Sequence, residues 1–432
     1  MSGQEPTRRL FLEAAAASLA GVLWRGDRAA AQPPDRSLGK GEIPAPVGPA
    51  DIPVSLKPTG ADLGRLYADV ERLARLHDFE YSFLGGRFRD FDEFKRRSRE
   101  KVLEVLLYRP RPVDPAPEVL SRTDLGDVIR EKVVFSTTPE FRVPAYVHIP
   151  KGLTGPAPAI VDLHSHGGMF IFGKEKVTDL GNNHPVMQEY HRKVYDGRPT
   201  GTALAKRGYV VISIDAFMFG ERRTILDADL KYGFDRSRYS VEDVRYLNAK
   251  CRAKEATLVK SLIYAGMTWP GIVVWDDIRT VDYLLTRPEV DPKRIGCNGI
   301  SLGGYRSLFL AGLDERIAAA NVVGFMSTVK SMIHARIDTH SWVHFPPTLH
   351  RYLDLPDVVS MMAPKPLLVQ QCEHDGLFTL QGMKDAVAKI AAIYEKAGAK
   401  GRFTGRFYDT LHRFTRQMQE DAFAFFDEHL KG

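Results

Sequence analysis

The sequence has few cysteines, no cluster of basic residues and no internal repeat. Its three cysteines are an odd number in 432 residues and have no C-x-x-C spacing, which argues against a disulfide framework and a structural zinc site. They are Cys251, Cys297 and Cys372. The 60 basic and 54 acidic residues leave a net charge of +6. No run of about five or six Lys or Arg suggests a nucleic-acid-binding arm.

Long apolar runs are missing as well. The stretch from Leu10 to Trp24 is short and contains Glu13, so we predict no permanent transmembrane helix. Paired arginines, Arg8 and Arg9, precede it, and an A-x-A pattern follows at residues 29–31. This arrangement resembles a twin-arginine export signal. We therefore predict a signal peptide at 1–31 and a periplasmic or secreted protein, with an ordinary amphipathic helix as the alternative.

Composition divides the remaining chain into three predicted parts. Residues 32–59 are rich in Pro and Gly, which indicates an extended linker. Residues 60–124 carry apolar residues at helical spacing and predict an N-terminal helical extension. Across 125–432 short apolar runs alternate with helical patterns. This alternation predicts an α/β catalytic domain with a mostly parallel central sheet and helices on both faces, whose chemistry lies at the carboxyl ends of the strands.

A glycine-flanked serine follows the apolar strand pattern "RIGCN". The segment Gly299-Ile300-Ser301-Leu302-Gly303 matches G-x-S-x-G and precedes the helical pattern "YRSLFLAGL". In a nucleophile elbow the serine occupies a strained strand-to-helix turn, and its neighbours two residues away must be small because strand and helix pass closely there. This context favours Ser301 as a nucleophile over a structural turn that contains a serine.

A serine nucleophile needs a base, and the base needs an acid that orients it. The strand pattern "PLLVQQC" opens into a loop where Asp375 directly precedes a glycine, so we predict Asp375 as the acid, with Glu373 as the alternative. His374 is a poor candidate base because it lies next to the acid in sequence. His412 follows the last strand pattern, in the nucleophile–acid–histidine order of α/β-hydrolases. We predict His412 as the base.

The oxyanion site should come from backbone N–H groups. One donor is predicted at Leu302, directly after the nucleophile. The other is expected in the loop "HSHGGMF" after an earlier strand, where we favour Gly168 and keep Gly167 and Met169 as alternatives. His164 and His166 are expected to hold this loop rather than bind metal. We predict no metal and no cofactor.

The chain resembles α/β-hydrolases of the acetyl xylan esterase-like and dienelactone hydrolase-like branch over residues 125–430. The supporting segments are His166-Gly167-Gly168, "DAFMFGERR", "WDDIRTVDYLLTRPEVDPKRIGCNGISLGG" and "APKPLLV" with the loop after it, together with His412. Dienelactone hydrolases use a cysteine nucleophile, whereas this chain has Ser301. The resemblance therefore implies the α/β-hydrolase fold and ester hydrolysis, and it argues against the lactone specialisation.

Two connections, 217–271 and 326–362, are longer than the sheet requires and resemble lids or binding loops. The second contains His334, His340, His344 and His350 together with Trp342, Phe345 and Tyr352. These residues could form an aromatic wall over Ser301 that suits a sugar or aromatic ester, or they could simply pack over the sheet. Glu221, Arg222 and Arg223 are expected to form a structural ion-pair network.

We therefore predict an exported serine hydrolase that cleaves carboxylic esters through a Ser301-His412-Asp375 triad and an acyl-enzyme. Short-chain esters of small molecules or carbohydrates are the substrates that the resemblance implies. The alternatives are a serine peptidase, because oligopeptidases share this fold, and a non-catalytic binding protein. No nucleic-acid partner is expected, and the sequence leaves self-association open, although hydrolases of this group often form rings.

Overall fold

The computed structural model describes residues 58–227, 229 and 235–432. The predicted signal peptide at 1–31 and nearly all of the predicted linker at 32–59 lie outside the described residues. Both stay predictions.

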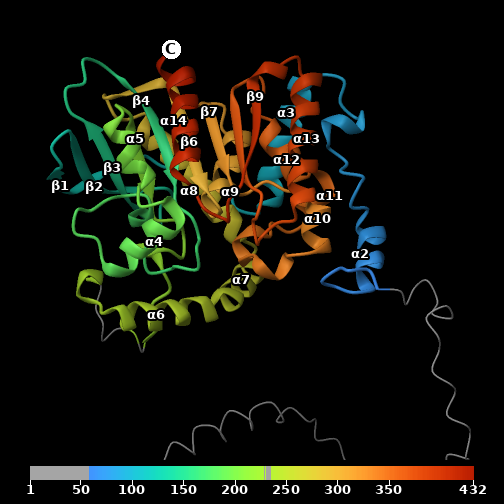
Figure 1. Ribbon diagram of the computed structural model, residues 1–432, viewed down its shortest axis with the longest axis horizontal. Helices are drawn as coiled ribbons and strands as arrows, with labels where there is room; N and C mark the ends of the chain where they lie inside the picture. Colours follow the sequence, from blue (N-terminus) through green and yellow to red (C-terminus); the bar gives the residue numbers. More distant parts are fainter. Residues whose placement is uncertain (1–57, 228, 230–234) are drawn as a thin grey trace, which may run out of the picture. The chain divides into compact units, whose positions relative to one another are not determined.

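The described residues contain a nine-stranded sheet in the order β1-β2-β3-β5-β4-β6-β7-β8-β9. From β1 to β5 the neighbours pair antiparallel, and from β5 to β9 they pair parallel. In Figure 1 the sheet runs from β1 at the left to β9 at the right. The strands are β1 (Glu118–Asp124), β2 (Val128–Ser136), β3 (Arg142–Pro150), β4 (Ala157–Leu163), β5 (Val210–Ile214), β6 (Val290–Ile300), β7 (Ile317–Val323), β8 (Leu367–Cys372) and β9 (Phe403–Tyr408).

Helices precede, connect and follow the strands of the sheet. They are α2 (Leu66–Ala74), α3 (Phe91–Val105), α4 (Pro185–Tyr195), α5 (Thr200–Lys206), α6 (Val241–Ala253), α7 (Glu255–Tyr264), α8 (Trp269–Leu284), α9 (Leu302–Leu313), α10 (Val329–His334), α11 (Leu349–Tyr352), α12 (Leu355–Ser360), α13 (Leu380–Lys396) and α14 (Arg416–Phe426). The predicted α/β fold, with a mostly parallel sheet, is confirmed.

Neighbouring side chains of β6 show that the two faces of the sheet carry different helices. The Sγ of Cys297 contacts the Ser307 carbonyl of α9 at 3.7 Å. The next side chain, Asn298, bonds Asp162, which in turn accepts a hydrogen bond from Thr200 of α5. Because successive side chains of a strand point to opposite faces, α9 covers one face and α5 covers the other.

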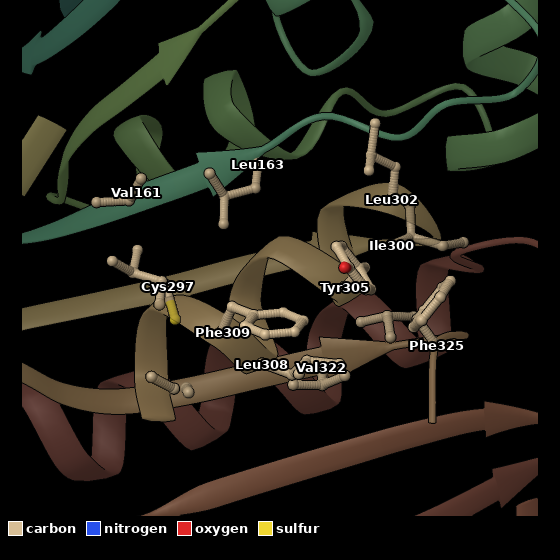
Figure 2. Close-up of a cluster of buried hydrophobic side chains, with 14 of the residues drawn as sticks. Val161, Leu163, Cys297, Ile300, Leu302, Tyr305, Leu308, Phe309, Val322 and Phe325 are labelled. Atoms are coloured by element: carbon tan, nitrogen blue, oxygen red, sulfur yellow. The ribbon is translucent and has the colours of Figure 1, made fainter. Parts of the chain in front are cut away.

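The β6–α9 turn lies within the hydrophobic core. Figure 2 shows buried side chains of β4, β6, α9 and β7 meeting there. Each of them is at most 1% exposed: Val161, Leu163, Cys297, Ile300, Leu302, Tyr305, Leu308, Phe309, Val322 and Phe325. Full burial of such side chains contributes on the order of 1.5–3 kcal/mol each. The turn that carries Ser301 is therefore held by packing on several sides.

The sheet begins at Glu118, before the predicted domain boundary at residue 125. β1 was included in the predicted helical extension because all seven of its residues are exposed, so its sequence lacks the apolar alternation that marks a strand. The helices α2 and α3 do form in this segment. α3 packs on the main domain, since Phe94 and Val102 are fully buried and Arg99 donates to the carbonyls of Gly312 and Met361.

No single helix in the described part of the chain is long and apolar enough to cross a membrane, although one pair bent by 83°, Val241–Tyr264 with Trp269–Leu284, passes the same test jointly.

Candidate active site

Ser301 stands alone between the end of β6 at Ile300 and the start of α9 at Leu302. Its backbone has φ 62° and ψ −122°, a conformation that a non-glycine residue adopts only under strain and that recurs at functional sites. The Ser301 N–H donates to the Val323 carbonyl at 2.9 Å, which ties the strained turn to the neighbouring strand β7. This is the geometry of a nucleophile elbow.

No side chain fits at either of the two glycines that flank Ser301, because the neighbouring backbone is too close. A Cβ on Gly303 would lie 1.9 Å from the carbonyl oxygen of Leu163 in β4, and a Cβ on Gly299 would lie 2.6 Å from the carbonyl carbon of Gly303. The atoms that would be met belong to the backbone, so no rotamer change relieves the overlap. The small residues expected from the motif therefore allow β4, β6 and α9 to approach one another.

The loops after β8 and β9 bring Asp375 and His412 together. The Nδ1–H of His412 donates to Asp375 Oδ2 at 2.7 Å, and the other carboxylate oxygen accepts the Leu377 N–H at 2.8 Å. The Asp375 side chain is fully buried, and that of His412 is 23% exposed. With its proton on Nδ1, neutral His412 presents Nε2 as an acceptor, and this atom has no hydrogen-bond partner among the described residues.

The alternative acid and base lie elsewhere. His374 Nε2 contacts Asp409 at 2.6 Å, and both side chains are largely exposed. His374 does not line the cavity that contains Ser301 and His412, and the carboxylate that His412 Nδ1 bonds is Asp375 and not Glu373. The geometry therefore brings Asp375 and His412 together beside the Ser301 cavity.

A cavity of about 590 Å³ opens over Ser301 and His412. Its walls come from the loop 166–168, from the end of α6 and the start of α7, from 338–344 and from 376–377. Both long connections thus contribute, since α6 and α7 belong to 217–271 and the residues 338–344 belong to 326–362. Of the seven aromatic and histidine residues singled out in the second connection, His340, Trp342 and His344 line the cavity, and the other four do not.

The loop after β4 holds the candidate oxyanion donors. The N–H of Gly168 donates to His166 Nδ1 at 2.9 Å, and the N–H of Met169 donates to the His166 carbonyl at 3.1 Å. The Gly167 N–H has no hydrogen-bond partner in the described part of the chain. Leu302 is the first residue of α9, where N–H groups have no intrahelical acceptor.

His164 and His166 support this loop. Fully buried His164 donates from Nδ1 to the Ser165 carbonyl and accepts the Ala216 N–H on Nε2, and burial holds its pKa well below the usual value. His166 Nε2 lies 3.3 Å from Glu255 Oε1 without hydrogen-bond alignment. Burial lowers the pKa of His166, and the Glu255 carboxylate opposes that shift. Both histidines are therefore placed as loop supports.

Glu255 was not singled out in the sequence. It is the first residue of α7, and its other oxygen accepts the Ser341 hydroxyl at 3.1 Å. Burial alone would raise its pKa, but the contacts with His166 and Ser341 outweigh burial and the pKa lies below the usual value. Glu255 therefore joins the loop 166–168, called the oxyanion loop below for its candidate donors, to the second connection. Only its position in the folded chain reveals this, since a charged residue at a helix start is ordinary.

Arg252, in the last turn of α6, was also missed. Its Nη2 lies 2.1 Å from the position that a Cβ on Gly168 would occupy, so the guanidinium packs directly on the oxyanion loop. The Gly168 carbonyl accepts a hydrogen bond from the Asn248 side chain, also of α6. α6 itself is fixed at its start by a capping box between Ser240 and Asp243.

A line of buried polar side chains crosses the sheet beneath the site. Asn298 Nδ2 donates to Asp162 Oδ1 at 2.7 Å, and Asn321 Nδ2 donates both to Asn298 Oδ1 at 2.9 Å and to Gln370 Oε1 at 3.0 Å. We call Asp162, Asn298, Asn321 and Gln370 the polar ladder. Asp162 and Asn321 each interrupt an otherwise apolar parallel strand, which was the sequence signal available for finding these two.

The predicted ion-pair network is present at the end of β5. Glu221 contacts fully buried Lys174 at 2.6 Å, and Arg222 contacts Asp276 at 2.6 Å. Arg223 donates instead to the Tyr239 hydroxyl and the Gly220 carbonyl. None of the three side chains lines the Ser301 cavity, which agrees with a structural role.

The three cysteines are free and buried. Across the described ranges no three His, Cys, Asp or Glu side chains are grouped to hold a metal ion.

The strained serine after a central parallel strand and the mostly parallel sheet define an α/β-hydrolase. Residues 66–421 match the Abhydrolase family, and the chain belongs to that family. It is 26% identical to the Bacillus subtilis (strain 168) protein YtaP, described only as a hydrolase, over 74% of this chain and 94% of that protein.

Solved structures share the fold at low sequence identity. A Bacteroides fragilis NCTC 9343 structure assigned as an acetyl xylan esterase has a TM-score of 0.58 at 20% identity and covers 82% of this chain and 86% of its own. The glucuronoyl esterase from Solibacter usitatus has a TM-score of 0.54 at 15% identity and covers 77% and 92%. A methylesterase, BT1017, has a TM-score of 0.54 at 18% identity and covers 84% and 68%.

Proposed function

We propose that this protein is an exported serine esterase that hydrolyses carboxylic esters, acetyl and other short-chain esters of carbohydrates among them. The observation that carries the proposal is the strained Ser301 turn in one cavity with His412, whose Nδ1 is held by buried Asp375. Solved structures with this fold carry the names acetyl xylan esterase, glucuronoyl esterase and methylesterase. These names support the proposed substrate class.

In the proposed reaction the Ser301 hydroxyl attacks the ester carbonyl carbon while His412 Nε2 takes the hydroxyl proton. Asp375 keeps the His412 proton on Nδ1 and stabilises the imidazolium that forms. The tetrahedral intermediate collapses, and His412 returns the proton to the leaving alcohol. Water then attacks the acyl-enzyme, with His412 again as the base, and the acid is released. The strained turn holds the serine in place before the substrate arrives, which lowers the entropic cost of reaction.

The tetrahedral oxyanion needs two donors. The Leu302 N–H is one, at the positive end of α9. Gly168, the donor we predicted, already donates to His166, so it could serve only if that bond broke. Gly167 has a free N–H in the same loop. We therefore assign the second donor to Gly167 in this arrangement of the loop.

One residue of the cavity wall supports a carbohydrate substrate. Trp342 lines the cavity and keeps 46% of its surface exposed, so its ring offers an apolar face at the opening. Aromatic rings with an exposed face bind the apolar side of amphipathic ligands.

The test compares the full chain with its Ser301→Ala variant on p-nitrophenyl acetate, butyrate and octanoate. We expect the wild type to hydrolyse the short esters and Ser301→Ala to lose roughly 10⁴-fold or more of kcat/KM. Ser261→Ala, an exposed serine of α7 outside the cavity, serves as the matched control and should match the wild type. Equal activity of all three proteins would refute the role of Ser301. Turnover of peptide p-nitroanilides in place of esters would establish the peptidase alternative.

Export is tested separately by replacing Arg8 and Arg9 with lysine. A twin-arginine signal requires the arginine pair, so the double variant should stay in the cytoplasm while the wild type reaches the periplasm or the medium. Equal distribution of the two proteins after cell fractionation would contradict the export prediction.

A further inference from the structure

His344 is buried in the cavity wall without a hydrogen-bond partner for either ring nitrogen. The residue is 8% exposed, and both nitrogens are shielded and unpaired among the described residues. The Ser341 carbonyl interacts with the ring but lies outside hydrogen-bond geometry. A buried polar group without a partner costs on the order of 1–3 kcal/mol, so its presence in a native fold needs an explanation.

Unpaired nitrogens alone would not point to a ligand. His148 of β3 is also fully buried with two unpaired nitrogens, but it does not line the Ser301 cavity. His344 differs because it lies in the wall of the cavity that contains Ser301 and His412. The His344 ring therefore borders the space that a ligand in this cavity would occupy.

In the neighbouring His340, a hydrogen bond shows which ring nitrogen carries the proton. Its Nδ1 lies 2.9 Å from the Arg336 carbonyl, which can only accept, so Nδ1 carries the proton. The remaining nitrogen, Nε2, is then an acceptor in the neutral ring. Nε2 is buried and has no partner in the described part of the chain. His340 also lines the cavity.

Burial disfavours the protonated form of both rings. Burial holds the pKa of His344 well below its usual value, and it lowers the pKa of His340. His344 packs against the rings of Tyr305 and Phe325, at centroid distances of 5.0 and 4.6 Å. Its own ring centroid lies 5.7 Å from that of His340. The wall therefore offers two groups in apolar surroundings. His340 Nε2 can accept a hydrogen bond, and the neighbouring His344 ring can both donate and accept.

This chemistry selects its ligand. An anion would be repelled by the lone pair of His340 Nε2, and an alkyl group would leave all three nitrogens unpaired. A hydroxyl group both donates and accepts, so it can satisfy a neutral imidazole of either tautomer. Vicinal hydroxyls on a ring can satisfy two neighbouring imidazoles, and Trp342, which lies between the two histidines in sequence and also lines the cavity, offers an aromatic ring to the apolar face of such a ligand.

We propose that His344, with His340, is the specificity determinant of the site and binds a free hydroxyl group adjacent to the scissile ester in a cyclic polyol substrate. This rests on the proposed esterase function and narrows it from esters in general to hydroxylated ring esters. Simple alkyl esters reach the triad but leave these histidines unpaired, and they are the poorer substrates for that reason.

The test uses two esters that differ by one hydroxyl group, trans-2-hydroxycyclohexyl acetate and cyclohexyl acetate, with acetate release as the readout. We expect the wild type to favour the hydroxy ester by about tenfold in kcat/KM, the value of one good hydrogen bond. In His344→Phe, which keeps a ring against Tyr305 and Phe325, this ratio should fall close to one. His344→Gln retains a donor and an acceptor and should restore part of the preference.

His148→Gln is the matched control. It replaces a buried, unpaired histidine away from the cavity, so its ratio should equal that of the wild type. A second measurement needs no variant: trans-1,2-cyclohexanediol should inhibit p-nitrophenyl acetate hydrolysis at lower concentration than cyclohexanol does.

The outcomes separate this proposal from the esterase assignment. Wild-type turnover of p-nitrophenyl acetate without preference for the hydroxy ester, or with equal inhibition by the two alcohols, overturns the role of His344 and leaves the triad intact. The same ratio in wild type and folded His344→Phe also overturns it. Inactivity of the wild type on all esters overturns both.

Discussion

Asp162 is the member of the polar ladder whose ionisation should govern stability. It is fully buried in β4, where it accepts hydrogen bonds from Asn298 and from Thr200. Burial raises the pKa of this carboxyl to about 7, against opposing contributions from its hydrogen bonds to Thr200 and Asn298 and from the charge of Arg306. The folded protein therefore favours the neutral acid over most of the acidic range.

The raised pKa of Asp162 makes the unfolding free energy depend on pH. The pKa of Asp162 is higher in the folded protein than in the unfolded chain, whose Asp pKa is about 3.9. The neutral form contributes its full stability below about pH 4, and this contribution is lost as pH rises through about 7. A shift of about three units corresponds to at most about 4 kcal/mol of unfolding free energy.

The Asp162→Asn variant cannot ionise but keeps the hydrogen bonds. The amide oxygen of asparagine can accept from Asn298, and its NH₂ group can donate to the Thr200 hydroxyl. We therefore expect the stability difference between variant and wild type to grow in favour of the variant from pH 4 to pH 7 and then to level off.

The assay is urea unfolding followed by tryptophan fluorescence at pH 4, 5, 6, 7 and 8. Asp385→Asn, an exposed aspartate of α13, is the matched control and should follow the wild type at every pH. The reasoning fails if the curves of Asp162→Asn and wild type stay parallel, within about 0.5 kcal/mol, across this range.

Three further predictions concern the site and the core. Asp375→Asn should lower kcat/KM for p-nitrophenyl acetate by about 10⁴-fold with unchanged circular dichroism, because His412 adopts the wrong tautomer; a loss under tenfold would contradict this role. Gly303→Ala should force the backbone away from the Leu163 carbonyl, destabilise the fold by about 1–3 kcal/mol in urea and abolish detectable esterase activity; wild-type activity would refute the close approach. Lys174→Met should destabilise the fold by about 3–5 kcal/mol because it removes the ion-pair partner of the fully buried Asp215 carboxylate, and thermal unfolding unchanged within 2 °C would be inconsistent with that ion pair.

The candidate triad was predictable because each member depends on local sequence and chain order. Five consecutive residues encode the G-x-S-x-G turn. The glycines on either side of Ser301 indicate that β4, β6 and α9 approach one another closely. Asp375 and His412 follow strands whose carboxyl ends meet at one edge of a parallel sheet. The structure places these two side chains in contact, and their catalytic roles stay predictions for the assays above.

The choice between Gly167 and Gly168 could not be made from sequence. Both glycines have positive φ, and which N–H is free depends on the hydrogen bond from Gly168 to His166. That bond depends on the orientation of the His166 imidazole, which packs against Phe170 and Phe219 and lies beside Glu255 from a helix far along the chain. β1 was missed for a related reason, since an exposed edge strand has no apolar alternation to reveal it.

By itself the sequence determined the fold class, the position of the strained serine and the order of its predicted acid and base along the chain. It could do so because secondary-structure periodicity and turn preferences depend on neighbouring residues. Only the tertiary structure decided which parts of the two long connections form the cavity wall. His340 and His344 line it, whereas His334 and His350 of the same connection do not. What places the two lining histidines is tertiary packing, since His344 packs on Tyr305 of α9 and on Phe325, and His340 packs on Phe325 and Phe378. These are contacts between segments that no local pattern encodes.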